Sequence, residues 1–160
     1  PRDGIGLVVK TVLEDSKLRQ KLLGNDSLWR KCVEEVFRLH SPVGTITRQT
    51  NSQVKIRGKT IPANSLVSGI LRSANRDEEH WNNPDSFDLH RKEGPHAAFA
   101  LGEHRCLGEW LGRQVVKNAS QRLFSRIGEL ELKADHEVEL RGFEFRGPLE
   151  LNCVWGNHVG

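Results

Sequence analysis

A single cysteine between two glycines is the feature of the sequence that points most directly to chemistry. Cys106 follows His104 and lies between Gly102 and Gly108 in the stretch AFALGEHRCLG. A helical pattern over 107–126 begins directly after it, so the sulfur is expected in the positive field of a helix N-terminus, which favours thiolate. The two glycines permit positive φ and the close approach of a flat, bulky group. The stretch therefore predicts one thiolate on a rigid loop, which suits haem iron better than a zinc cage with several ligands.

Two other interpretations of this cysteine remain open. A lone cysteine is also often an inert packing residue. His96, His104 and Cys106 could instead hold zinc, although no fourth ligand is evident. Cys32, on an apolar helical stripe, and Cys153, in a strand-like terminal segment, are interpreted as packing residues. Three cysteines without a CxxC pair argue against a disulfide framework and predict a reducing compartment, the cytoplasm.

Composition limits the other classes of protein. The 160 residues allow one domain with a hydrophobic core. The net charge is +3, and acidic residues are interspersed among the basic ones, so a nucleic-acid partner is not expected. Apolar runs are too short to span a bilayer. The chain begins on Pro1 and contains no methionine, which predicts that the protein begins further upstream.

The elements that must position the cysteine are mainly helical. Helices are expected over 5–13, over 18–24 with Gly24 as C-cap, and over 28–41, where Asp26 or Ser27 caps the start and Pro42 ends the helix. Short strands and turns are expected from 43 to 67, an irregular meander over 83–96, and strand-like alternation over 129–155. The predicted class is α+β, mainly helical. The apolar face of the helix over 107–126 is expected to consist of Leu107, Leu111, Val115, Ala119 and Leu123.

The cysteine loop resembles that of the cytochrome P450 haem-thiolate monooxygenases. Their pattern F-x-x-G-x-(H/R)-x-C-x-G is matched by Phe99, Gly102, His104, Cys106 and Gly108. By this resemblance Cys106 is the axial ligand of haem iron. Phe99 would pack beside the haem and the sulfur, and His104 would hydrogen-bond a haem propionate.

Other motifs of the same family surround the loop. EEVFR matches E-x-x-R with Glu35 and Arg38, and NPDSFDLHR places Arg91 where the family's third charged partner completes a Glu-Arg-Arg triad. The role that the resemblance implies for the triad is structural, since a buried ion network fixes geometry more than it adds stability. Arg48 falls where the family often binds the second propionate. SANRD and GPHAAF resemble two further family segments.

The resemblance also implies the reaction and its partners. The cofactor would be haem b, and the reaction would be O2 activation with oxygen insertion into a small, mainly apolar organic substrate. Electrons would come ultimately from NAD(P)H through a ferredoxin- or flavodoxin-type donor. The substrate-contact candidates are Val43, Gly44, Thr45, Ile46, Phe143 and Phe145. A docking patch for the acidic donor, or an ordinary solvated face, could be made by Arg91, Lys92, Arg105, Arg113 and Lys117.

The matching segments correspond to the C-terminal portion of the family's fold. Residues 1–160 are therefore expected to be a partial domain of a soluble, bacterial-type enzyme. The acid and alcohol that relay protons in the family should lie upstream of Pro1, so no catalytic residue is assigned here and Asp3 is not the relay acid. This portion alone is expected to be inactive. The alternative is a non-catalytic haem-binding remnant or scavenger.

Overall fold

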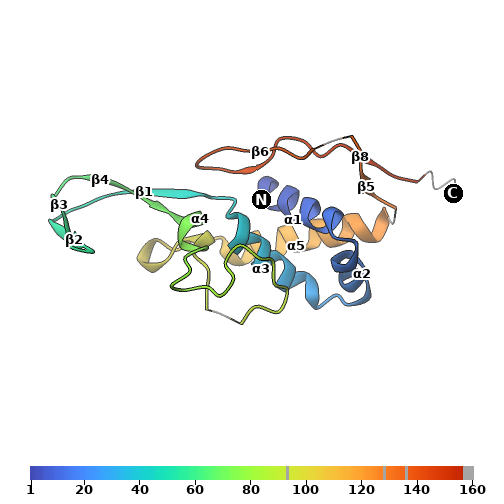
Figure 1. Cartoon of the computed structure of the whole chain (residues 1–160), viewed down its shortest axis with the longest axis horizontal. Coiled ribbons are helices and arrows are strands. Elements are labelled where there is room, and N and C mark those ends of the chain that lie inside the picture. Colours follow the sequence, from blue (N-terminus) through green and yellow to red (C-terminus); the bar gives the residue numbers. More distant parts are fainter. Residues whose placement is uncertain (93, 128, 136, 157–160) are drawn as a thin grey trace.

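Four helices form the body of the protein in the computed structural model, which describes residues 1–92, 94–127, 129–135 and 137–156 (Figure 1). They are α1 (Arg2–Glu14), α2 (Ser16–Gly24), α3 (Leu28–His40) and α5 (Glu109–Arg126). α1 packs against both α3 and α5, and these two also contact each other. The shared core is apolar and includes Leu7, Val8, Val12, Trp29, Val33, Val36, Val116 and Phe124. Burial of these side chains is the main force that holds the helices together.

The boundaries of α2 and α3 differ from the expected caps. Gly24 is the last helical residue of α2, and its C-cap is Asn25 with an extended backbone. In the described structure neither Asp26 nor Ser27 caps α3 with its side chain. Ser27 already has a helical backbone and its hydroxyl donates to Asn25 Oδ1 at 2.7 Å. The Asn25 side chain therefore stabilises the turn before α3. Ser27, whose backbone is already helical, does not cap the helix with its side chain.

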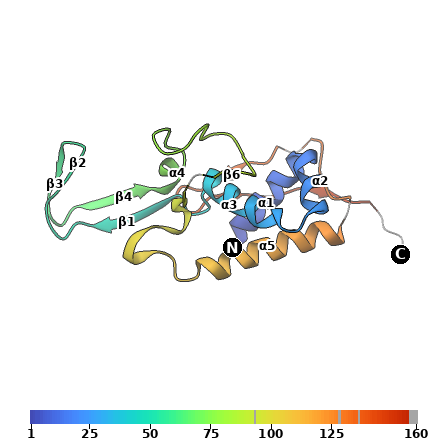
Figure 2. The same ribbon diagram turned by 90° about the horizontal axis from the view of Figure 1, so that it is seen from below.

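A long two-stranded ribbon projects from the helical body (Figure 2). Strand β1 (Thr45–Gln49) pairs antiparallel with β4 (Leu66–Ile70), and the hairpin of β2 (Val54–Ile56) and β3 (Lys59–Ile61) lies at the far end. Arg57 and Gly58 turn this hairpin, both with positive φ, as tight hairpin turns require. The C-terminal segment forms two short antiparallel pairs, β5 (Glu131–Leu132) with β8 (Cys153–Val154) and β6 (Leu140–Arg141) with β7 (Gly147–Pro148).

The apolar face predicted for α5 is only partly buried. The structure buries Val116, Ser120 and Phe124, whereas Leu111 is 61% exposed and Val115 is 39% exposed. Leu107 precedes the helix and is fully exposed. Apolar periodicity identifies an apolar face but not what covers it. In this chain Leu111 and Val115 of the predicted face border a cavity, Leu123 packs against the core, and the neighbouring face meets α1 and α3.

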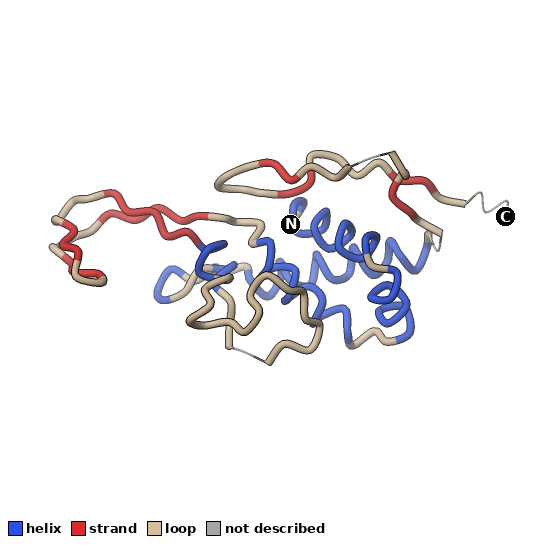
Figure 3. The backbone as a smooth tube through the Cα atoms, viewed as in Figure 1, coloured by secondary structure: helices blue, strands red, loops and turns tan. Residues whose placement is uncertain are grey.

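Irregular chain connects the ribbon to α5 (Figure 3). It begins with α4 (Leu71–Ala74), continues through the meander, and ends with two short 3₁₀ turns, η1 (Ala97–Phe99) and η2 (Gly102–His104). Cys106 follows η2 and lies three residues before α5. The cysteine is therefore held between the meander and the long helix.

Candidate functional site

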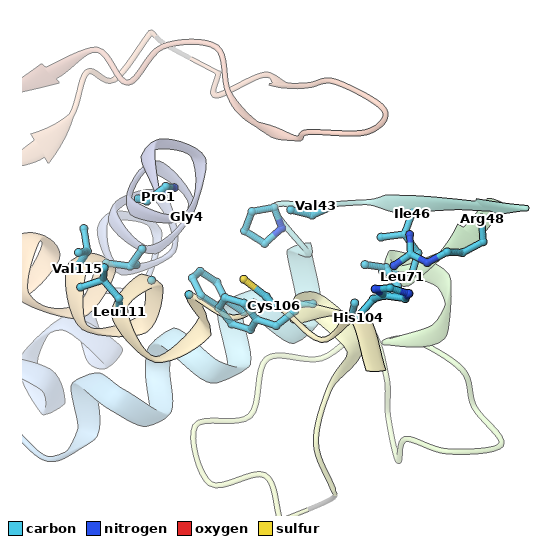
Figure 4. A pocket seen from close by; sticks show the side chains of 18 residues that line it. Pro1, Gly4, Val43, Ile46, Arg48, Leu71, His104, Cys106, Leu111 and Val115 are labelled. Atoms are coloured by element: carbon cyan, nitrogen blue, oxygen red, sulfur yellow. The ribbon is translucent and has the colours of Figure 1, made fainter. Parts of the chain in front are cut away.

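The cysteine loop lines an apolar cavity of about 460 Å³ (Figure 4). The Cys106 side chain is exposed and lies in the middle of the view, between a wall of α1 and α5 and the beginning of the ribbon. The wall from the helices includes Gly4, Leu111 and Val115. The remaining lining residues are Pro1, Phe37, Pro42, Val43, Ile46, Arg48, Leu71, Ala98, Phe99, Ala100, His104, Gly108, Gly112 and Val116.

Backbone hydrogen bonds fold the cysteine loop. The Cys106 N–H donates to the Phe99 carbonyl at 2.9 Å, and the Arg105 N–H donates to the Gly102 carbonyl at 3.0 Å. Gly102 has φ +76°, as expected, but Gly108 has φ −87° and needs no left-handed conformation. Ala100 takes the second positive φ of the loop, +58°. Gly108 instead leaves space, because a Cβ placed there would meet no described atom within 4 Å.

Two basic side chains lie at one end of the cavity. Arg48 and His104 are both exposed and line the cavity on the side away from Leu111 and Val115 (Figure 4). Arg48 comes from β1 and His104 from η2, so the ribbon and the loop bring them together. The Arg48 Nη1 donates to the Thr47 carbonyl at 2.8 Å, which leaves its other donors available on this side. Two such groups can bind a pair of carboxylates.

The structure joins Glu35, Arg38 and Arg91 in one buried ion network. Arg38 Nε and Nη2 each lie 2.8 Å from a Glu35 carboxylate oxygen, and Arg91 Nε lies 2.9 Å from Glu35 Oε1. Arg38 also donates to the carbonyls of Pro84 and Ser86, and Arg91 to Ser86. The network therefore ties α3 to the meander. Because the meander leads into the cysteine loop, α3 sets the position of that loop.

Asn75 is a positioning residue that the sequence reasoning missed. Its side chain is buried, its Oδ1 accepts from the Ala97 N–H at 2.6 Å, and its Nδ2 donates to Ser41 Oγ at 2.8 Å. Its carbonyl accepts from Arg38 Nη1 at 2.8 Å. One asparagine thus links the end of α3 to the start of η1. The sequence signal for Asn75 was its place in the segment SANRD. Its role follows from its burial, because a buried amide must find several hydrogen-bond partners.

The zinc interpretation is not supported by the described structure. His96 points its Nε2 at Glu34 Oε2, 3.0 Å away, and its Nδ1 accepts from the Ala98 N–H at 3.2 Å. Both ring nitrogens are therefore engaged away from the cavity. Among the residues described, no group of three His, Cys, Asp or Glu side chains could hold a metal ion. Cys106 is thus a single exposed thiol, a donor set that suits a tetrapyrrole-bound metal better than zinc.

The other two cysteines lie in packed surroundings. Cys32 is fully buried in the core, and burial, with a smaller effect of Glu35, raises the pKa of its thiol to about 12. Cys153 is half-buried in β8, and burial raises its pKa as well. All three cysteines are free thiols. The two packed thiols are thus poor nucleophiles and poor metal ligands.

The substrate-contact candidates do not all reach the cavity. Val43 and Ile46 line it, whereas Gly44 and Thr45 are buried behind them. Phe143 and Phe145 are 65% and 67% exposed and lie in the loop between β6 and β7, outside the lining of this cavity. An antiparallel bridge between Val43 and Phe145 nevertheless joins the two segments. The C-terminal hairpin therefore borders the cavity through the backbone of 42–46.

The predicted docking patch is smaller than expected. Arg91 is only 7% exposed because it belongs to the Glu35 network. Arg113 is 20% exposed and pairs with Glu34 and Glu109. Lys92 and Arg105 remain at the surface, and Lys117 is partly exposed. The expectation that Arg91 could belong to the docking patch is therefore corrected. Its charge pairs with Glu35 inside the protein and is not presented to a partner.

Asp3 lies away from the cysteine cavity. Its carboxylate pairs with Arg2 at 2.9 Å, and it lines a different hollow, between α1 and the β6–β7 hairpin.

In the described part of the chain, no helix has the length and apolar character to cross a membrane.

The cavity suits the haem that the sequence resemblance implies. Its walls are apolar, a single thiol is exposed at its centre, and two basic side chains lie at one end. A flat macrocycle with one axial thiolate and two carboxylates has the same distribution of chemistry. Gly108 and Gly112 keep the cavity's wall free of side chains beside the loop.

Comparisons with known proteins place this arrangement in a family. The model of the family "Cytochrome P450" matches residues 9–140. Cytochrome P450 BJ-1 of Bradyrhizobium diazoefficiens is 36% identical over 79% of this chain, and the biotin biosynthesis cytochrome P450 of Bacillus subtilis is 37% identical over 89%. The matched parts are 34% and 36% of those relatives, so the chain spans about a third of their length.

Solved structures agree with the sequence relatives. P450BioI in complex with an acyl carrier protein ligated to hexadec-9Z-enoic acid superposes with a TM-score of 0.88 at 34% identity, covering 96% of this chain and 40% of that one. The ligand-free cytochrome P450 TbtJ1 gives a TM-score of 0.90 at 32% identity, covering 96% and 41%. With the family model matching most of the chain, relatives of this identity and the same fold around one exposed cysteine, the chain belongs to the cytochrome P450 family.

Proposed function

We propose that this chain is the haem-binding C-terminal portion of a haem-thiolate monooxygenase, with Cys106 as the axial ligand of haem b. The observation that carries the proposal is the exposed sulfur at the centre of an apolar cavity that has Arg48 and His104 at one end. Family membership supports haem and monooxygenase chemistry in general. The proposal extends to residues 1–160 as one partial domain.

The residues of this chain would bind and orient the cofactor. A thiolate-bound haem supplies O2 activation and oxygen insertion into an organic substrate. Cys106 would hold the metal from one side, Phe99 would pack beside the sulfur, and Gly102 and Gly108 would shape the loop. Arg48 and His104 would bind the two propionates, which fixes the rotation of the ring in its plane. The proton relay is proposed to lie upstream of Pro1.

The substrate is proposed to be small, organic and mainly apolar. Val43 and Ile46 present apolar side chains to the cavity, and the same strand is bridged to Phe145 of the C-terminal hairpin. Apolar lining favours substrates that lose their hydration on entry. Thr45, Gly44 and Phe143 would shape this part of the site indirectly, through the backbone.

Electrons are proposed to arrive from NAD(P)H through an acidic ferredoxin- or flavodoxin-type donor. Lys92, Arg105 and Lys117 remain at least partly exposed, with Arg105 in the cysteine loop itself and paired with Glu109, and complementary charge speeds the encounter of partners. The three free thiols support a reducing compartment, the cytoplasm.

The absorption spectrum of the reduced carbon monoxide complex tests the ligand. The protein as encoded should show the red-shifted band typical of a thiolate ligand, and Cys106→Ser should abolish that band. Cys153→Ser is the matched control and should retain it. A thiolate-type band that survives Cys106→Ser would refute the assignment. For residues 1–160 alone we expect weak haem binding and no turnover, because Leu107, Trp110 and other apolar side chains outside the cavity are left exposed.

A further inference from the structure

A second ion network lies beside the Glu35 network and reaches the cysteine loop by another route. Glu34 of α3 accepts from Arg113 Nε at 2.7 Å and faces His96 Nε2 at 3.0 Å. Arg113 Nη1 also lies 3.1 Å from Glu109 Oε2, and Arg105 Nε donates to the same oxygen at 2.8 Å. The guanidinium of Arg113 is thus held between carboxylates from two helices.

This guanidinium lies over the ring of Phe99. The Arg113 Cζ is 4.2 Å from the ring centroid, a distance at which a cation over an aromatic face is attractive. Phe37 contacts the same ring edge-on, with centroids 5.3 Å apart. The Phe99 carbonyl accepts the Cys106 N–H at 2.9 Å. A chain of contacts therefore leads from Glu34 through Arg113 and Phe99 to the backbone of the cysteine.

The charges of this network are mutually stabilised. Burial raises the pKa of Glu34, but hydrogen bonds from His96 and Arg113 outweigh it, so the net pKa lies below the ordinary value. Burial lowers the pKa of Arg113, and the bonds from Glu34 and Glu109 reverse this into a net rise. Both groups therefore stay ionised near neutral pH. A guanidinium anchored at Nε and Nη1 has a fixed plane, which a lysine cannot reproduce.

We propose that Arg113 is a positioning residue for the cysteine loop: Glu34 and Glu109 set the plane of its guanidinium, and the guanidinium holds Phe99 so that the Cys106 backbone keeps its place. Arg113 thus belongs to the interior support of the loop and not to a docking patch. The position of the loop does not depend on the proposed function; only the consequence for a bound metal rests on it.

Hydrogen exchange at the Cys106 amide tests the positioning role in the protein as encoded, without any cofactor. Arg113→Gln should speed that exchange about tenfold, the equivalent of about 1.4 kcal/mol. Arg122→Gln is the matched control, because Arg122 is exposed on the same helix and the charge change is the same. The control should exchange like the wild type. Equal exchange in the two variants would overturn the proposal.

Two further variants separate geometry from charge. Glu34→Gln keeps Arg113 but weakens its anchor, and it should also speed exchange at the Cys106 amide. This variant carries the test if Arg113→Gln fails to fold. Arg113→Lys keeps the charge but loses the planar fork, and it should resemble Arg113→Gln. Wild-type exchange in Arg113→Lys would overturn the geometric role. In the haem-loaded protein, the thiolate-type band of Arg113→Gln should decay about tenfold faster than that of Arg122→Gln. Faster exchange at Cys106 in Arg113→Gln, together with a thiolate-type band that is absent from the wild type as well, would fault the proposed ligand and not the loop support.

Discussion

Arg38 donates two hydrogen bonds to the carboxylate of Glu35, which lies one turn earlier on the same helix. Its Nε and Nη2 are each 2.8 Å from a carboxylate oxygen, and the two side chains are 1% and 4% exposed. Such a pair is specific in geometry, since a planar fork meets a planar carboxylate. Both residues also bind the meander, so the pair connects a helix of the core with the segment that precedes the cysteine.

Glu35→Gln should therefore destabilise the protein strongly. It leaves Arg38 buried with an uncompensated charge, and losses of about 3–5 kcal/mol in the free energy of unfolding are typical of such changes. Denaturant unfolding measures the loss. The control is Glu79→Gln, because Glu79 pairs with Arg57 at the surface, where both side chains are more than 70% exposed. That variant should lose less than about 1 kcal/mol. A similar loss in both variants would contradict the structural importance of the buried network.

The three thiols should react in a defined order with an alkylating reagent when no haem is bound. Cys106 is exposed, Cys153 is half-buried with a raised pKa, and Cys32 is buried with a pKa of about 12. The thiolate is the nucleophile, so we expect Cys106 to react first and Cys32 last. Peptide mass spectrometry after timed labelling gives the order. Added haem should slow the labelling of Cys106 alone. Early labelling of Cys32 would show that the helical core is open.

His40 should make stability depend on pH. Burial first, and then the positive charges of Lys10, Arg76 and Arg146, lower its pKa from 6.5 to about 4. Between these values the unfolded chain binds a proton that the folded protein excludes. Stability should therefore fall as the pH drops through this window, by up to about 1.4 kcal/mol per pH unit, and the effect should level off below it.

The variant His40→Gln isolates this effect. Denaturant unfolding at several pH values across the window should show a shallower dependence for the variant than for the wild type. His90→Gln is the control, because His90 is exposed in the meander, and it should keep the wild-type slope. Identical slopes for the wild type and His40→Gln would contradict the burial of a neutral imidazole at the end of α3.

Ala100→Gly should stabilise the cysteine loop. Ala100 has φ +58° and ψ 175°, a region that is open to glycine and strained for other residues. Relief of about 1–3 kcal/mol exceeds the entropic cost of glycine, about 0.5–1 kcal/mol. We expect a net gain of about 1 kcal/mol in the free energy of unfolding. A loss of stability in this variant would show that the alanine methyl group, which is buried, contributes more by packing.

Local sequence determined much of what surrounds the cysteine. The order Phe99, Gly102, Cys106 identifies the loop, because glycine permits the positive φ of Gly102 and the cysteine supplies a free sulfur. Glu35 and Arg38 can be paired from their spacing, because residues three apart share one face of a helix. The helices α1, α3 and α5 follow from apolar periodicity. All of these are short-range properties, which is why a sequence carries them.

The faces that these elements bury, and the partners that they meet, depend on the packing of the whole chain. The exposed face of α5 and the buried one are both apolar in part, and the packing of α1 and α3 selected Val116 and Phe124 for the core. Glu34 and Arg113 are 79 positions apart, so no local sequence pattern predicts their contact or the partial burial of Arg113. The same holds for Asn75, whose partners come from α3 and η1. Long-range hydrogen bonds are decided by where the folded elements lie, and the sequence encodes that only through the packing of the whole chain.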